Sequence, residues 1–139
     1  MSQKLASAVV QKMMEKDYFS RWLGIKVLNI EAGKCRLEMQ IRREMLNGFG
    51  IAHGGIAYAL ADSALAFAAN SHGIQAVSIE TQISHLKAVA ENDQLLAIAQ
   101  ETHLGKTLAR YDVHIFNQKQ EKVAIFKGTV YRTGKVWEV

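Results

Sequence analysis

The sequence has 139 residues, of which 49% are hydrophobic and 22% are charged, with one cysteine and no proline. This composition is typical of one globular domain, and it excludes a disordered chain, a collagen-like chain and a low-complexity array. Lys and Arg total 17 against 13 acidic residues, a net charge of +4, and they are scattered along the chain. Because nucleic-acid-binding proteins usually cluster their basic residues, we expect no nucleic-acid partner. A small anionic ligand accounts for the excess as well as a polynucleotide would.

The chain is expected to begin with two helices. Apolar residues recur at helical spacing over residues 3–16, and a short second helix is expected over 17–23. We therefore expect an N-terminal helical segment over residues 1–22. An extended stretch follows from Gly24, and then a turn at Ala32 and Gly33. Apolar and polar residues alternate over 36–41, which predicts a half-buried strand.

A long helix is predicted after an irregular segment over residues 42–53. Residues 54–72 are rich in Ala and Leu and contain no Pro, and no Gly after the first two positions. They are apolar on nearly all sides, so we expect the helix to be buried all round. Gly73 is placed to end it as the C′ glycine.

Four strands are predicted after this helix, over residues 77–86, 95–102, 107–116 and 122–132. The third alternates clearly, with Ala109, Tyr111, Val113 and Ile115 on one face. A twisted antiparallel sheet of five or six strands, wrapped around the central helix, buries that helix best. The sequence therefore predicts an α+β fold in one domain over residues 1–139.

No signal for secretion, membrane insertion or metal binding is found. The apolar run over residues 5–10 is too short for a signal peptide, and the run over 56–69 is interrupted and too short to span a bilayer. Cys35 alone cannot form a disulfide or a four-thiolate zinc site within one chain, and the five histidines lack metal-ligand spacing. We expect a cytoplasmic protein with no membrane partner, metal or cofactor.

Asp62 is the most informative single residue, because it lies inside the apolar helix. A carboxylate in an apolar environment is unfavourable unless it is paired or hydrogen-bonded. Its helical neighbours at three and four residues are Tyr58, Ala59, Leu65 and Ala66, so no local cation pairs with it. The alternatives are a structural Asp that is bonded to distant backbone and a working carboxylate; placement against solvation preference favours the second.

His53, Gly54 and Gly55 stand where the helix begins. The first turn of a helix has free N–H groups at a positive dipole end, and glycine lets a ligand approach the backbone closely. Such an end can bind an anion or the oxyanion that develops on a carbonyl under attack. The alternative is a simple flexible loop with glycines chosen for their backbone angles.

The motif around the start of the long helix resembles that of a known protein family. Asn47, His53-Gly54-Gly55 and Asp62, at these spacings and with Asn70-Ser71 beyond, are similar to the hotdog-fold acyl-CoA thioesterases, above all the phenylacetate-degradation (PaaI-type) group. The resemblance covers roughly residues 20 to 134 and implies a hotdog fold. The sequence departs from the family at 84–88, where Ser-His-Leu-Lys-Ala replaces a segment that often contains Phe-Leu-Arg-Pro.

The resemblance implies hydrolysis of acyl-CoA, with an aryl-acetyl or similar medium acyl group, and assigns roles to individual residues. Asp62 is the nucleophile or the general base, and the backbone N–H of Gly54 polarises the thioester carbonyl. Asn47 and His53 shape the site. Substrate-binding roles fall to Gly55, to the Ser78 hydroxyl, and to Lys87 and Lys106, which would meet the CoA phosphates; solvated surface charges are the alternative for both lysines.

Helix geometry adds an expectation about assembly. Gly54 and Asp62 are eight residues apart on one helix, a rise of about 12 Å, so one carbonyl cannot contact both from the same chain. The two roles together require a site at a two-fold interface of a homodimer, and we expect a dimer of dimers, a homotetramer. The alternatives are a thioesterase acting on a carrier protein and a non-catalytic regulatory domain that binds acyl-CoA. A binding module would have no use for a buried Asp62.

Overall fold

The computed structural model describes residues 2–139, and every helix it describes lies in the first half. The elements there are α1 (Ser2–Lys16), α2 (Tyr18–Leu23), β1 (Lys26–Glu31), β2 (Lys34–Gln40), the 3-10 helix η1 (Arg43–Met45) and α3 (Gly54–Asn70). The second half consists of strands, namely β3 (Ile74–His85), β4 (Gln94–Leu104), β5 (Leu108–Phe116) and β6 (Lys122–Val136). Asp17 caps α2 and Gly24 ends it in the left-handed conformation, at a φ of 77°.

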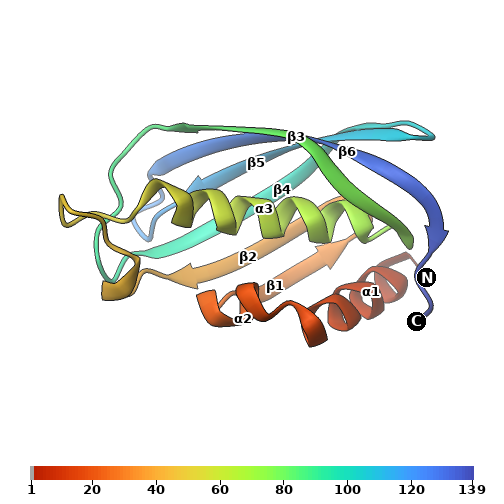
Figure 1. Cartoon of the computed structure of the whole chain (residues 1–139), viewed down its shortest axis with the longest axis horizontal. Coiled ribbons are helices and arrows are strands. Elements are labelled where there is room, and N and C mark those ends of the chain that lie inside the picture. The colour runs from red at the N-terminus through yellow and green to blue at the C-terminus, as the bar shows by residue number, and fades with distance from the viewer. Residues whose placement is uncertain (1) are drawn as a thin grey trace.

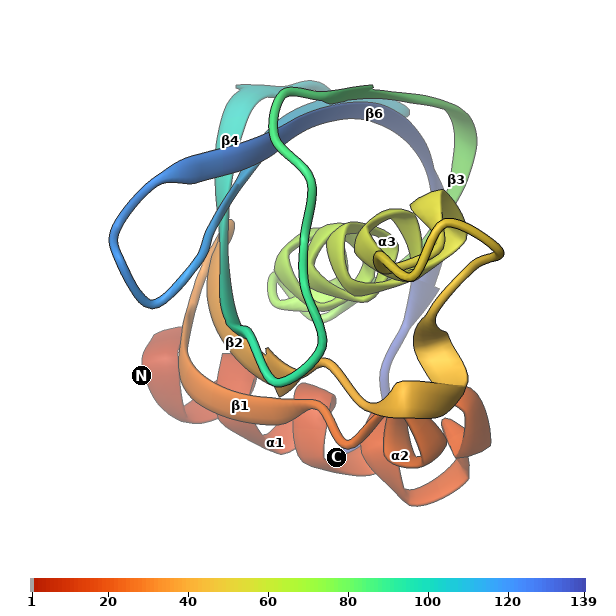
Figure 2. The same cartoon turned by 90° about the vertical axis from the view of Figure 1, so that its left-hand side faces the viewer.

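All six strands form one antiparallel sheet in the order β1-β2-β4-β5-β6-β3 (Figure 1). The sheet curves around α3, while α1 and α2 lie beneath β1 (Figure 2). The alternation predicted in β5 is confirmed, because Ala109, Tyr111, Val113 and Ile115 are all buried under the sheet. The predicted α+β architecture, with a sheet wrapped around a central helix, is therefore correct.

The central helix differs from the expectation in one respect. Leu60, Ala61, Ala64 and Phe67 are fully buried, but α3 is not buried all round. Gly55, Ala59, Asp62 and Ala66 form a stripe of partly or fully exposed positions. The spacing of four, three and four residues places them on one helical face. Asp62 thus lies on the open face of α3.

Three of the four strands after α3 are longer than predicted, and the helix ends differently. β3 begins at Ile74, three residues early, and β6 continues to Val136. β3 is an edge strand with mostly exposed side chains, including Val77 and Ile79 at 58% and 60%, so its first residues lack a clear burial pattern. Ser71 caps α3, and Gly73 adopts a φ of 89° two residues later rather than at C′.

Side-chain hydrogen bonds attach the C-terminal end of α3 to the sheet. Asn70 accepts from the backbone N–H of Ala76 and from Trp137 Nε1, both at 2.9 Å. Ser71 Oγ accepts from Gly33 N–H at 2.7 Å. His72 Nε2 lies 2.6 Å from Glu101 Oε2, which also accepts from Tyr111 at 2.7 Å. This end of the helix is therefore held by the β1–β2 turn, β3, β4 and the C-terminal segment.

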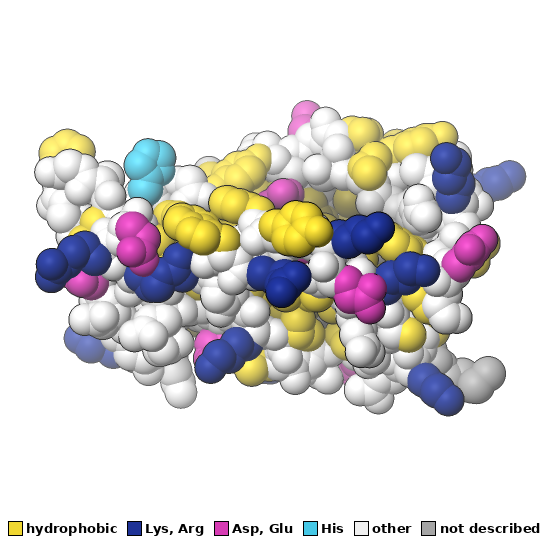
Figure 3. Space-filling model, turned by 60° about the horizontal axis from the view of Figure 1, so that its bottom comes forward, with side chains coloured by type: hydrophobic (Ala, Val, Ile, Leu, Met, Phe, Trp, Pro, Cys, Tyr) yellow, Lys and Arg dark blue, Asp and Glu magenta, His cyan; other side chains and the backbone are white. Residues whose placement is uncertain are grey.

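The face that carries α1 and α2 mixes apolar side chains with charges of both signs (Figure 3). Tyr18, Phe19 and Trp22 are exposed on α2, Phe19 and Trp22 are stacked, and the Arg42 guanidinium lies 5.0 Å from the Trp22 ring centre. No helix within residues 2–139 has both the length and the apolar character needed to cross a membrane.

Candidate active site

The loop before α3 is ordered by Asn47 and His53. Asn47 Oδ1 accepts from the backbone N–H groups of Phe49 at 2.9 Å and Ile51 at 3.4 Å, which closes the loop on itself. His53 is the N-cap of α3, and its Nδ1 accepts from Gly55 N–H at 3.0 Å. Both side chains therefore hold the start of α3 in place through hydrogen bonds to backbone.

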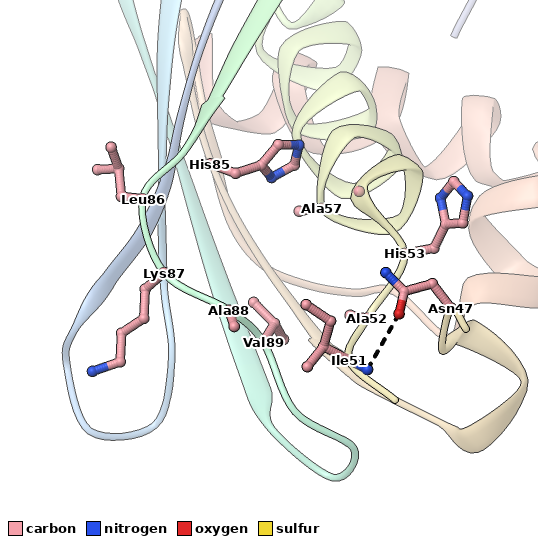
Figure 4. A pocket seen from close by; sticks show the side chains of 11 residues that line it. Asn47, Ile51, Ala52, His53, Ala57, His85, Leu86, Lys87, Ala88 and Val89 are labelled. Carbon is pink, nitrogen blue, oxygen red and sulfur yellow. Dashed lines mark hydrogen bonds between the residues drawn. The ribbon is translucent and has the colours of Figure 1, made fainter. Parts of the chain in front are cut away.

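A cleft of about 330 Å³ opens at this end of the helix, between the loop and the segment that follows β3 (Figure 4). Its lining residues are Asn47, Ile51, Ala52, His53, Gly54, Ala57, His85, Leu86, Lys87, Ala88 and Val89. The N–H of Gly55 is used by the cap, whereas that of Gly54 has no acceptor among residues 2–139. Gly54 thus offers a free donor at the positive end of the helix dipole.

The glycines here serve close approach rather than unusual backbone angles. Neither Gly54 nor Gly55 has a positive φ. A Cβ at Gly54 would lie 3.2 Å from His85 Nε2, and a Cβ at Gly55 would lie 3.3 Å from His53 Nδ1. The alternative explanation from the sequence, glycines chosen for their backbone angles, is therefore not what the geometry favours.

Asp62 lies on the half-open face of α3, eight residues beyond Gly54. Burial raises the pKa of its carboxyl group, and the charge of Asp17 raises it further. No group within residues 2–139 donates a hydrogen bond to this carboxyl group, so nothing among them offsets these two causes. A structural Asp bonded to distant backbone is likewise not observed.

A chain of side-chain hydrogen bonds connects Asp17 to the helix that carries Asp62. Asp17 accepts from Ser20 Oγ at 2.8 Å and from Ser20 N–H at 3.0 Å. Ser20 Oγ lies 2.7 Å from Ser63 Oγ, and both serines are buried. Asp17 is therefore fixed beside α3 and cannot turn its charge freely away from Asp62.

The structure brings only some of the predicted site residues together. Asn47, His53, Gly54 and Lys87 line the cleft, and Gly55 adjoins it. Lys87 points away from α3 and pairs with Glu121 (Figure 4).

Asp62 and Ser78 do not line the cleft. Counted from the α3–β3 connection, Asp62 is eight residues back along the helix and Ser78 is four residues along the strand. These are rises of about 12 Å and about 13 Å. Lys106 lies in the β4–β5 turn and does not line the cleft.

Two residues of this region were missed by the sequence analysis. His85 ends β3 and faces Gly54, and the only signal in the sequence was its departure from the family pattern at 84–88. Asp17 approaches Asp62 from a segment 45 positions earlier in the chain. No local spacing indicates such a contact.

Comparisons with known proteins agree on the family. The family model described as the thioesterase superfamily matches residues 49–124. Acyl-coenzyme A thioesterase PaaI of Escherichia coli is 39% identical over 122 residues, covering 88% of this chain and 87% of that protein.

Two solved structures extend the likeness to three dimensions. The structure of E. coli PaaI, from the phenylacetic acid degradation operon, superposes with a TM-score of 0.96 at 36% identity and covers 99% of this chain and 100% of that one. A Streptococcus mutans protein bound to acetyl CoA has a TM-score of 0.78 at 30% identity, covering 81% and 90% of the two chains. The chain therefore belongs to the thioesterase superfamily, among the hotdog-fold thioesterases of the PaaI type.

Proposed function

We propose that this protein hydrolyses acyl-CoA thioesters with an aryl-acetyl or similar medium acyl group, releasing the free acid and CoA. The observation that carries the proposal is Asp62, a half-buried carboxylate with no donor among residues 2–139, on the open face of a helix that starts with a free N–H. Thioester hydrolysis needs an attacking group and donors for the developing oxyanion. In this proposal Asp62 is the attacking group or its base, and the Gly54 N–H is a donor to the oxyanion.

The proposed reaction assigns the bond changes to these two groups. Asp62 either attacks the carbonyl carbon itself or removes a proton from an attacking water molecule. The carbonyl oxygen gains negative charge and accepts from Gly54 N–H. The C–S bond then breaks, and the CoA thiolate takes up a proton. Where Asp62 itself has attacked, water then hydrolyses the acyl–Asp62 anhydride, which releases the free acid and restores the carboxylate. Either route requires an ionised Asp62, so the causes that raise the pKa of this carboxyl group bear directly on the rate.

We further propose that two copies form each site. The rise of about 12 Å between Gly54 and Asp62 along one unbroken helix prevents one carbonyl from contacting both. The edge strand β3 exposes Val77 and Ile79, and an open strand edge favours association with another chain. Asp62 and Ser78 of one chain would then face Gly54, His53 and Asn47 of its partner. Light scattering should give two or four times 15.5 kDa, four chains corresponding to a dimer of dimers.

The test compares Asp62→Asn with a matched control, Asp112→Asn, which changes another half-buried Asp on the outer face of β5. Free thiol release is measured with aryl-acetyl-CoA, straight-chain acyl-CoA and a carrier-protein thioester, with and without a chelator. We expect hydrolysis of acyl-CoA in chelator, a loss of at least about 10²-fold in kcat for Asp62→Asn, and none for the control. Near-wild-type turnover by folded Asp62→Asn would show that the catalytic assignment is wrong.

A further inference from the structure

The imidazole of His85 faces the first residue of α3 across the cleft (Figure 4). His85 is the last residue of β3, where its backbone is in register with Ala124 of β6. Measured from the position of a Cβ on Gly54, Nε2 lies at 3.2 Å, and the two nearest ring carbons lie at 3.6 and 3.9 Å. The ring therefore presents a nitrogen, rather than an apolar edge, to the start of the helix.

Neither the His85 ring nor the Gly54 N–H is engaged elsewhere in the described chain. His53 and His72 each use a ring nitrogen in a contact with protein, at 3.0 Å to Gly55 N and at 2.6 Å to Glu101. No such partner is found for the nitrogens of His85 within residues 2–139, and its side chain is exposed to the cleft. Two free hydrogen-bonding groups thus converge on one point of the cleft wall.

Their separation suits a shared acceptor. The N atom and the Cβ position of one residue lie about 2.5 Å apart, so His85 Nε2 lies within about 5.7 Å of the Gly54 nitrogen. An oxygen that accepts from two donors at about 2.9 Å can connect nitrogens up to about 5.8 Å apart. A single carbonyl oxygen can therefore reach both groups without movement of the backbone.

We propose that His85 Nε2–H is a second donor to the thioester carbonyl oxygen, beside the N–H of Gly54. This inference rests on the proposed function. The donor is available in the neutral tautomer that carries hydrogen on Nε2 and also in the imidazolium form. Negative charge grows on that oxygen during attack, so both hydrogen bonds strengthen toward the transition state and favour kcat over ground-state binding. His85 transfers no proton in this role.

The experiment uses the full-length protein and three variants. His85→Phe keeps an aromatic ring without a donor, and His85→Gln keeps an N–H donor without the ring. The matched control, His114→Phe, changes an imidazole on the outer face of β5, away from the cleft. For each protein, kcat and KM with acyl-CoA, the dissociation constant for CoA alone and the melting temperature are measured.

We expect His85→Phe to lower kcat by about 10²-fold, as for the loss of one oxyanion donor, while KM changes by less than about threefold. His85→Gln should recover at least about tenfold of that loss, because its amide can donate to the same oxygen. Affinity for CoA, which has no carbonyl under attack, should be unchanged in both variants. His114→Phe should match the wild type throughout.

Several results would overturn this role. A folded His85→Phe variant with kcat within about threefold of wild type would show that His85 is not a donor to the carbonyl oxygen. If His85→Gln is as slow as His85→Phe, the ring shape matters and not the donor. A parallel loss of CoA affinity would mean that His85 holds the CoA moiety. If the wild type itself does not hydrolyse acyl-CoA, the proposed function has failed and this inference with it, which the wild-type measurement alone distinguishes.

Discussion

Pairing two inactive variants tests whether the site is shared between chains. Asp62→Ala removes the attacking carboxylate, and Gly54→Pro removes the N–H donor. The structure favours proline at position 54, because Gly54 is the first residue of α3, where proline is well accepted. His53 has φ −60° and ψ 139°, a conformation that suits a residue before proline. A Cβ at this position would lie 3.2 Å from His85 Nε2, and the His85 ring is exposed and can move.

The expected magnitude follows from the position of each group. The two altered residues lie about 12 Å apart on one helix, so each homodimer has two damaged sites. In a mixed dimer, the Asp62→Ala chain supplies an intact Gly54 and the Gly54→Pro chain supplies an intact Asp62. One site is then whole and the other has both defects. A purified heterodimer should therefore show about half of wild-type activity, and a randomly mixed population, in which about half the dimers are mixed, about a quarter.

The assay uses co-expression, because a tight dimer need not exchange subunits. Two different tags isolate the heterodimer, and thiol release from acyl-CoA is compared with each homodimer. Elution volume and melting temperature show whether Gly54→Pro is folded. A doubly purified heterodimer with no activity above the single variants would refute the shared site, while the assignment as a thioesterase would stand on Asp62→Asn.

Two further predictions concern charge around the site. Asp17→Asn should move the acid limb of the kcat/KM profile to lower pH. Burial and then the charge of Asp17 raise the pKa of Asp62, and Asn removes the second cause while keeping the helix cap. An acid limb that stays in place or moves to higher pH would contradict the coupling between Asp17 and Asp62. Lys87→Glu should raise KM about tenfold for acyl-CoA but not for a thioester without the nucleotide, since a basic residue at the cleft attracts phosphate. Lys106→Glu should raise KM for acyl-CoA in the same way only if a partner chain brings the β4–β5 turn to the cleft. For either lysine, equal effects on both substrates would show that the residue does not bind the nucleotide.

Regular patterns made much of the fold predictable. In β5 the apolar residues from Ala109 to Ile115 are buried and the polar residues alternate with them, and most of the apolar residues of α3 are buried. The hydrophobic pattern of each segment therefore predicts its structure. The ends of β3 and β6 were harder to predict. β3 is an edge strand with apolar residues exposed at Val77 and Ile79, so its pattern does not separate an inner from an outer face.

The candidate site was predictable where chemistry and helix geometry coincide. Gly54, His53 and Asn47 share one loop and helix start, and a motif within one segment identifies them. Asp62 was conspicuous because a carboxylate contradicts the apolar helix around it. His85 and Asp17 were not found, because their approach depends on how the sheet curves and how α2 packs on α3, which no local spacing encodes.

The two ends of α3 are held in different ways, so the protein should tolerate substitutions near one end of this helix better than near the other. At the far end, Asn70, Ser71 and His72 use side chains to fix the helix to β3, β4, the β1–β2 turn and the C-terminal segment. At the cleft end, the walls are a loop and the irregular chain after β3. Substitutions in those walls leave the anchors untouched. The cleft can therefore diverge toward new acyl groups while the framework stays constant, and directed evolution of selectivity should begin at residues 86–89.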